Sequence, residues 1–174
     1  GNTCYVITVA QVLMRVPVVL EWLRRHSHDG CPGEQTTCVL CALFQTYCQV
    51  RDGLSNQRKC CPVLVQRRGL VHECFGDRRQ HDAVEFFEKF FDAARAVEME
   101  AGRYGLWGGV QMDVPKVTHA DRVFRFIVET RRRCKGCQKV RSWYAAENVL
   151  QLEAREVDGG ALTISEMYLA GCAS

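Results

Sequence analysis

The chain has 174 residues, of which 47% are hydrophobic, 25% charged and 9% aromatic. These are ordinary values for a globular protein, so disorder is not expected, and the length suits one domain with its own core. The formal net charge is only +3. Because basic residues are spread along the chain, apart from the run 131–133, we expect no nucleic-acid partner.

The cysteine content points to a reducing compartment. There are eleven cysteines, an odd number, in a chain too long to need disulfides for folding. No charged and then apolar leader is visible at the start, and the longest apolar run, residues 16–20, is too short to cross a bilayer. We therefore expect an intracellular protein of the cytoplasm or nucleus, with no membrane contact.

Helical spacing of apolar residues dominates the first hundred residues. Asn2 and Thr3 are expected to cap a first helix, and Pro17 suits either the start of the second helix or the turn before it. The predicted helical ranges are 4–14, 18–25, 38–50, weakly 63–74, and 80–99, with a turn at 75–79.

The range 80–99 has the clearest periodicity and is predicted to be a core helix. Its polar face carries Glu85, Glu88, Lys89 and Asp92, and a run of glycines from Gly102 should end it. The predicted apolar stripe consists of Ala83, Phe86, Phe87, Phe90, Phe91 and Ala94.

Strand-forming residues dominate after Pro115. The ranges 123–128 and 140–152 are rich in aromatic and β-branched residues and flank the turn 134–137, and a short helix is predicted at 165–170. Helices followed by antiparallel strands predict an α+β fold. We expect a helical part at 1–101 and a strand-rich part at 115–174.

Cys4 is the first candidate for chemistry. It lies at the predicted start of a helix, and a helix N-terminus favours the thiolate, which is the nucleophilic form of a cysteine. The alternative is a small buried hydrophobic residue, which placement alone favours because free cysteines are usually buried.

Asp82 and Glu85 lie one turn apart at the start of the helix predicted at 80–99. Two carboxylates placed there could present a negative patch to a basic peptide. They could equally serve only to cap the helix and complement its dipole.

The stretches GNTCY and QHDAVEFF together resemble two sequence boxes of the ubiquitin-specific protease family, in the N-terminal part of its catalytic domain. CVLCALFQTY resembles a helix between those boxes in some members, and HADRVFRF with RCKGCQKVRSWYAAENVLQL resembles the start of the fingers. The resemblance implies an incomplete papain-like fold, with a helical thumb-like lobe followed by the antiparallel strands of the fingers and palm.

The resemblance also implies a function, namely hydrolysis of the bond after the C-terminal glycine of ubiquitin. Cys4 would be the nucleophile, with Asn2, Thr3 and Gln80 beside the oxyanion or lining the cleft. Asp82 and Glu85 would bind the arginines of the ubiquitin tail. His81 departs from the family pattern, in which glutamine or glutamate is more usual.

Family members take their general-base histidine and its Asp or Asn partner from a C-terminal box that this sequence does not show, and an oxyanion-hole asparagine from a position before Gly1. We therefore expect a piece of a longer protein that is inactive alone. His119 is expected at the entry to the fingers, and His72 and His81 to be structural or exposed, so none replaces the base.

Two groups of cysteines could bind metal, although catalysis needs no cofactor. Cys134 and Cys137 form half of a zinc site, so structural zinc is expected in a longer parent protein. A second group is Cys38, Cys41 and Cys48, with His26, His28 and Cys31 nearby. Its three helical thiols are three and seven residues apart on one face, which favours simple core packing.

Three functions remain open at this stage. The first is a deubiquitinating thiol peptidase, which is preferred. The second is a catalytically dead module that binds ubiquitin or a ubiquitinated protein through Asp82 and Glu85. The third is a zinc scaffold without ubiquitin contact, which would bind stoichiometric metal and unfold with a chelator. The oligomeric state is not predicted.

Overall fold

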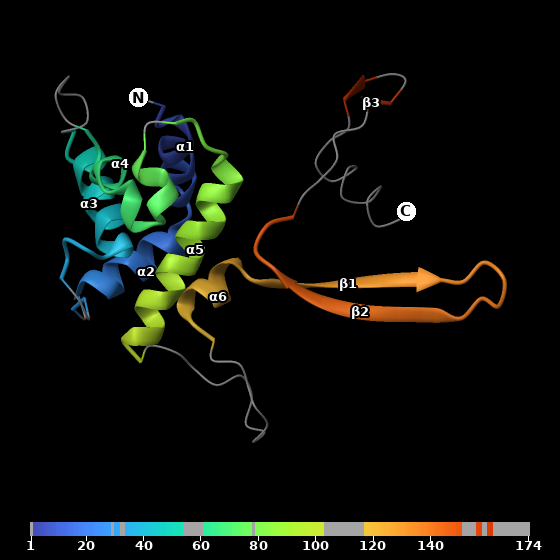
Figure 1. The fold of residues 1–174 in the computed structure, drawn as a ribbon. Helices are drawn as coiled ribbons and strands as arrows, with labels where there is room; N and C mark the ends of the chain where they lie inside the picture. Colours follow the sequence, from blue (N-terminus) through green and yellow to red (C-terminus); the bar gives the residue numbers. More distant parts are fainter. Residues whose placement is uncertain are drawn as a thin grey trace. The chain divides into compact units, whose positions relative to one another are not determined.

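The computed structural model describes residues 2–28, 30–31, 34–53, 61–77, 79–102, 117–150, 156–157 and 160–161. They form two compact units, Gly1–Arg125 and Phe126–Ser174. The first unit is helical and the second holds the strands, so the fold class is α+β, as predicted (Figure 1).

The helical unit is built from short and medium helices around one core. Their bounds are α1 Cys4–Leu13, α2 Pro17–His28, α3 Val39–Arg51, α4 Val63–Gln66, α5 Ala83–Glu100 and α6 His119–Phe124, with 3₁₀ turns η2 Arg68–Leu70 and η3 Glu73–Gly76. The predicted turn at 75–79 is partly wrong, because Phe75 lies in η3 and is completely buried.

Helix α1 begins at Cys4, as predicted, but its capping differs from the prediction. Thr3 occupies the N-cap position, and its side chain makes no capping hydrogen bond. The physical reason is its backbone conformation, with φ −123° and ψ 9°, which is outside the extended region from which N-cap hydroxyls reach the first turn. Pro17 is the first residue of α2, where its missing N–H costs nothing.

Helix α5 is the central element of the helical unit, in contact with α1, α3 and α6. Its predicted apolar stripe is confirmed, since Phe86, Phe90, Phe91 and Ala94 are buried. The helix starts at Ala83 rather than Gln80 because Asp82 caps it. It ends at Glu100, and Gly102 follows with φ +65°, a left-handed conformation that favours glycine.

Glu98 is a buried acid of α5 that joins three helices. Its Oε1 accepts a hydrogen bond of 2.8 Å from Trp22 Nε1 on α2, and its Oε2 accepts one of 3.0 Å from the backbone N–H of Ala120 on α6. Its side chain is only 2% exposed. The carboxylate therefore fixes α2 and α6 against α5.

Helix α6 occupies residues for which strand was predicted, including Val123 and Phe124, so that prediction is wrong. The reason is a capping box, in which the Thr118 hydroxyl accepts from the Asp121 N–H and the Asp121 carboxylate accepts from the Thr118 N–H. The ring of Phe124 then packs edge-on against Trp22, Phe87 and Phe91.

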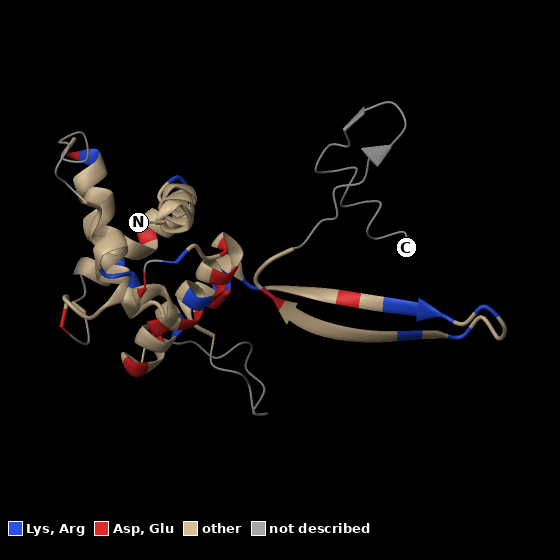
Figure 2. Ribbon diagram, turned by 45° about the horizontal axis from the view of Figure 1, so that its top comes forward, with Lys and Arg blue, Asp and Glu red and all other residues tan. Residues whose placement is uncertain are grey.

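The second unit contains a hairpin of β1 Phe126–Arg133 and β2 Val140–Glu147, paired antiparallel from Phe126↔Glu147 to Arg133↔Val140. β2 thus ends before the predicted residue 152. A second pair, β3 Glu156–Val157 and β4 Gly160–Ala161, was not predicted. Basic residues gather toward the hairpin turn (Figure 2). The helix predicted at 165–170 lies outside the described residues.

In the described part of the chain, no single helix is long and apolar enough to cross a membrane. Helices α1 and α2 reach that length and composition only as a pair, across a bend of 93°.

Candidate active site

Cys4 occupies the first turn of α1, and its side chain is exposed and free. The first N–H groups of a helix have no partner within the helix, and here the Thr3 side chain does not bind them. A reactant at the Cys4 sulfur would therefore lie close to backbone donors at the positive end of the helix dipole. Cys4 is therefore not the small buried residue that its placement in the sequence alone favoured.

A cluster of aromatic rings joins the start of α1 to the segment before α5. The Tyr5 ring lies 5.4 Å from the His81 ring and 5.3 Å from the Phe86 ring, centroid to centroid, in edge-on geometry. Phe75 completes the cluster, 5.0 Å from both His81 and Phe86. Because Tyr5 follows Cys4 and His81 precedes Asp82, the cluster brings the two sequence boxes together.

Tyr5 also carries a buried hydroxyl, although its ring is the part that packs. The hydroxyl makes no hydrogen bond among the described residues. Burial raises the pKa of Tyr5, and the nearby positive charge of Arg68 opposes that rise. Arg68 in turn donates hydrogen bonds to the backbone oxygens of Val65 and Asp77, which restrain its side chain.

Asp82 and Glu85 are both exposed. Asp82 caps α5, since its Oδ1 accepts 2.7 Å and 3.0 Å hydrogen bonds from the N–H groups of Val84 and Glu85. Capping therefore does occur, and both capping bonds use the same oxygen. The exposed carboxylates remain open to an additional basic ligand. Gln80 is exposed as well, and its role stays a prediction.

His81 supports the loop that leads into α5. Only 14% of its side chain is exposed, and its Nε2 lies 2.8 Å from Asp77 Oδ1. The hydrogen bond from His81 is the main reason why the pKa of Asp77 is lowered. His81 thus packs its ring among the aromatic side chains and directs a polar edge at Asp77.

The other described histidine side chains also have structural partners. His72 contacts Cys74, with 3.1 Å between Nδ1 and Sγ, and His119 lies 3.3 Å from Glu98. His26 is buried beside Cys38 and Cys41. The histidines whose side chains are described thus have cysteine, aspartate or glutamate side chains as polar partners, and none of these partners is Cys4.

Cys134 and Cys137 bracket the hairpin turn of the second unit, and both thiols are exposed. Hydrogen bonds from the backbone N–H groups of Cys137 and Gly136 lower the pKa of Cys134. Such N–H groups around a sulfur favour the thiolate, the form that binds metal. Their role as half of a zinc site stays a prediction, because the possible metal-binding group among the described residues lies in the helical unit.

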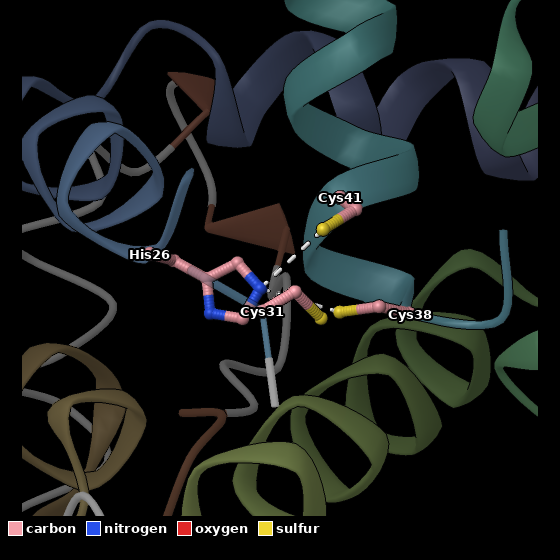
Figure 3. A group of neighbouring side chains, drawn as sticks. All are labelled: His26, Cys31, Cys38 and Cys41. Carbon is pink, nitrogen blue, oxygen red and sulfur yellow. Dashed lines mark hydrogen bonds between the residues drawn. The ribbon is translucent and has the colours of Figure 1, made fainter. Parts of the chain in front are cut away.

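The helical unit holds a second cluster of metal-binding side chains. His26, Cys31, Cys38 and Cys41, here called the His-Cys cluster, have ligand atoms that all lie within 4.8 Å of one another (Figure 3). The expectation that Cys38 and Cys41 belong only to the core is thus incomplete, because their sulfurs face a histidine and a third thiol. Cys48 does not belong to the cluster.

Burial is the main reason why the pKa is raised for two thiols of this cluster, Cys38 and Cys41. It raises the pKa of the Cys38 thiol, against the smaller opposing effect of the backbone N–H groups of Cys41 and Leu40. Burial and the neighbouring Cys38 sulfur also raise the pKa of Cys41. Without a cation, these thiols are therefore held in the protonated form.

The family model for ubiquitin carboxyl-terminal hydrolase matches residues 1–167. The chain therefore belongs to this family, in agreement with the resemblance of its two sequence boxes.

Relatives named ubiquitin carboxyl-terminal hydrolase 36 support this membership. The protein from Drosophila simulans is 26% identical over 165 residues, which cover 91% of this chain and 16% of the relative. The protein from Drosophila melanogaster is also 26% identical, over 91% of this chain and 15% of the relative. The protein from Drosophila virilis is 26% identical over 91% of this chain and 13% of the relative. The chain thus spans about a sixth or less of the length of these relatives.

Proposed function

We propose that this chain supplies the nucleophile and the binding wall for the ubiquitin tail in a cysteine-type deubiquitinase. The observation that carries the proposal is the exposed Cys4 thiol in the first turn of α1, joined through Tyr5 and His81 to the acidic start of α5. Family membership supports the choice of substrate.

In this proposal, the Cys4 thiolate attacks the carbonyl carbon of the terminal glycine of ubiquitin. The developing oxyanion accepts hydrogen bonds from backbone N–H groups at the start of α1, with Asn2, Thr3 and Gln80 nearby. The C–N bond then breaks, and the amine leaves with a proton from the general acid. Water hydrolyses the resulting thioester, which restores the thiol and releases the ubiquitin carboxylate.

Asp82 and Glu85 would bind the basic ubiquitin tail by charge-assisted hydrogen bonds. The general base would be a histidine outside the described residues, and catalysis would need no cofactor. We also propose an intracellular location, because all cysteines that the structure describes are free thiols. Structural zinc at Cys134 and Cys137 would need the remaining ligands from elsewhere in the protein.

The test is hydrolysis of a fluorogenic ubiquitin amide by the longest natural form of the protein. We expect turnover that is abolished by Cys4→Ser and retained by Cys61→Ser, a control at another exposed cysteine. Turnover that survives Cys4→Ser would refute the assignment of the nucleophile. Binding of ubiquitin without any turnover would instead favour the alternative function, a ubiquitin-binding module built on the same acidic start of α5.

A further inference from the structure

The four donors of the His-Cys cluster come from separate places in the fold. His26 lies near the end of α2, Cys31 lies in the connection to α3, Cys38 is the N-cap residue of α3, and Cys41 belongs to its first turn. Figure 3 shows the imidazole and the three sulfurs converging on a common centre. The fold thus brings together residues that the sequence separates into two pairs.

The spacing of these atoms suits a tetrahedral ion. The Nε2 atom of His26 lies 3.3 Å from the Cys38 sulfur and 3.5 Å from the Cys41 sulfur, and all four donors lie within 4.8 Å of one another. Zinc bonds to sulfur and nitrogen would place ligand atoms about 3.6 to 3.8 Å apart around a tetrahedron. The two nitrogen–sulfur distances are already close to this spacing, so only small shifts of the ligand atoms are needed to complete a tetrahedron.

The donor types narrow the choice of metal. Three thiols and one imidazole are soft or borderline ligands, which disfavours calcium and magnesium. His26, Cys38 and Cys41 are 3%, 4% and 6% exposed, so a bound ion would be largely shielded from solvent. Four protein ligands and little water access are typical of structural rather than catalytic zinc.

Three thiols beside one imidazole are poorly explained as packing alone. A disulfide could use only two of the three sulfurs, and the structure holds all three as free thiols. A cation coordinates all four groups together. The spacing within each pair also agrees, with four residues between His26 and Cys31 and two between Cys38 and Cys41.

We propose that His26, Cys31, Cys38 and Cys41 bind one structural zinc ion. The ion fixes the end of α2 to the start of α3 and closes the connection between them, which contains Gly30 at φ +84°. The site is separate in sequence and ligands from the cysteine pair of the hairpin. It does not depend on the proposed peptidase activity.

The test is the zinc content of the full chain, purified under reducing conditions and measured by elemental mass spectrometry. To remove any contribution from the hairpin, all variants are made in a Cys134→Ser and Cys137→Ser background. We expect one zinc ion per chain in this background, which is lost in Cys41→Ser and kept in Cys48→Ser. Cys48 lies on the same helix outside the cluster, which makes it the matched control.

A second measurement uses the unsubstituted cluster, so it does not depend on the folding of a variant. Chelated protein is refilled with Co²⁺, and a tetrahedral thiolate site is expected to give charge-transfer absorption and intense visible bands. Thiol-alkylation mapping should show Cys31, Cys38 and Cys41 protected only when the metal is bound. The proposal would be overturned if the protein with Cys134→Ser and Cys137→Ser contained no zinc and also failed to take up Co²⁺. It would equally be overturned if zinc persisted when Cys41→Ser was added.

Discussion

The rings of Tyr5 and His81 pack in edge-on geometry, with a centroid distance of 5.4 Å and an interplanar angle of 66°. This contact joins the residue after the candidate nucleophile to the residue before the acidic cap of α5. Since aromatic pairs of this geometry add stability beyond their buried area, the contact helps to fix the relative position of the two helix starts. Substitutions at Tyr5 should therefore separate the contribution of the ring to stability from that of the hydroxyl group.

Tyr5→Phe should leave the free energy of unfolding unchanged or slightly higher, because the ring stays and an unbonded buried hydroxyl is removed. Tyr5→Ala should lower it by about 3 to 5 kcal/mol, since it empties the centre of the aromatic cluster. Urea denaturation measures both. A loss in Tyr5→Phe as large as in Tyr5→Ala would show that the hydroxyl, not the ring, holds the cluster.

Asp82→Asn separates ubiquitin binding from helix capping. Asparagine caps about as well as aspartate, so stability should change by less than about 0.5 kcal/mol, whereas Asp82→Ala should cost about 1 kcal/mol. Both changes remove the charge and should weaken ubiquitin binding, as should Glu85→Gln. Titration of labelled ubiquitin, followed by chemical shifts of its tail, measures the affinity. Equal binding by Asp82→Asn and the unchanged chain would remove Asp82 from the tail-binding surface.

Glu98→Ala should destabilise the helical unit by about 2 to 4 kcal/mol, because the buried donors of Trp22 and Ala120 lose their acceptor. Glu98→Gln keeps one acceptor oxygen and should cost less. Glu100→Ala is the matched control, since Glu100 is exposed on the same helix and should change stability by less than about 0.5 kcal/mol. Thermal or urea unfolding measures the stability of all three variants. A loss of stability in Glu98→Ala as small as that in Glu100→Ala would contradict the role of Glu98 in holding α2 and α6 against α5.

Asp121 predicts an acid-dependent part of stability. Burial alone would raise the pKa of this carboxyl, but hydrogen bonds from Thr118 and the charge of Arg95 outweigh it and lower the pKa. The folded pKa thus lies below the unfolded value of about 3.9. The contribution to stability is complete above that value and is lost as the pH falls through the folded pKa.

Asp121→Asn should therefore cost about 1 to 3 kcal/mol at neutral pH, by breaking the capping box and the contacts to Arg95 and Arg125. The difference in unfolding free energy from the unchanged chain should shrink as the pH falls from about 5 to about 2. Urea titrations across that range test the sign. A difference that stays constant or grows in acid would contradict the lowered pKa.

Local sequence signals predicted most of the helical unit. The 3.6-residue period located α1, α3 and α5, and α2 begins at Pro17, one residue before its predicted range. The errors arose at element ends, where capping outweighs periodicity. Asp82 moved the start of α5, and the Thr118–Asp121 capping box turned residues expected in a strand into α6. That box was readable in the sequence.

The site was only partly predictable for a different reason. Cys4 could be placed at a helix start from neighbouring residues alone, whereas the roles of Tyr5 and Glu98 depend on contacts between distant segments. The His-Cys cluster lies between these cases. Its paired spacing was visible, but helical periodicity gave Cys38 and Cys41 a sufficient explanation as core residues, and only the fold brings His26 and Cys31 beside them.

Mapping of a covalent ubiquitin adduct tests the central claim most directly. The longest natural form of the protein is incubated with ubiquitin that carries a thiol-reactive electrophile at its C-terminus, and the modified cysteine is identified by peptide mass spectrometry. The account predicts one adduct, on Cys4, absent in Cys4→Ala and unchanged in Cys61→Ala. No adduct, or an adduct on a different cysteine, would contradict it.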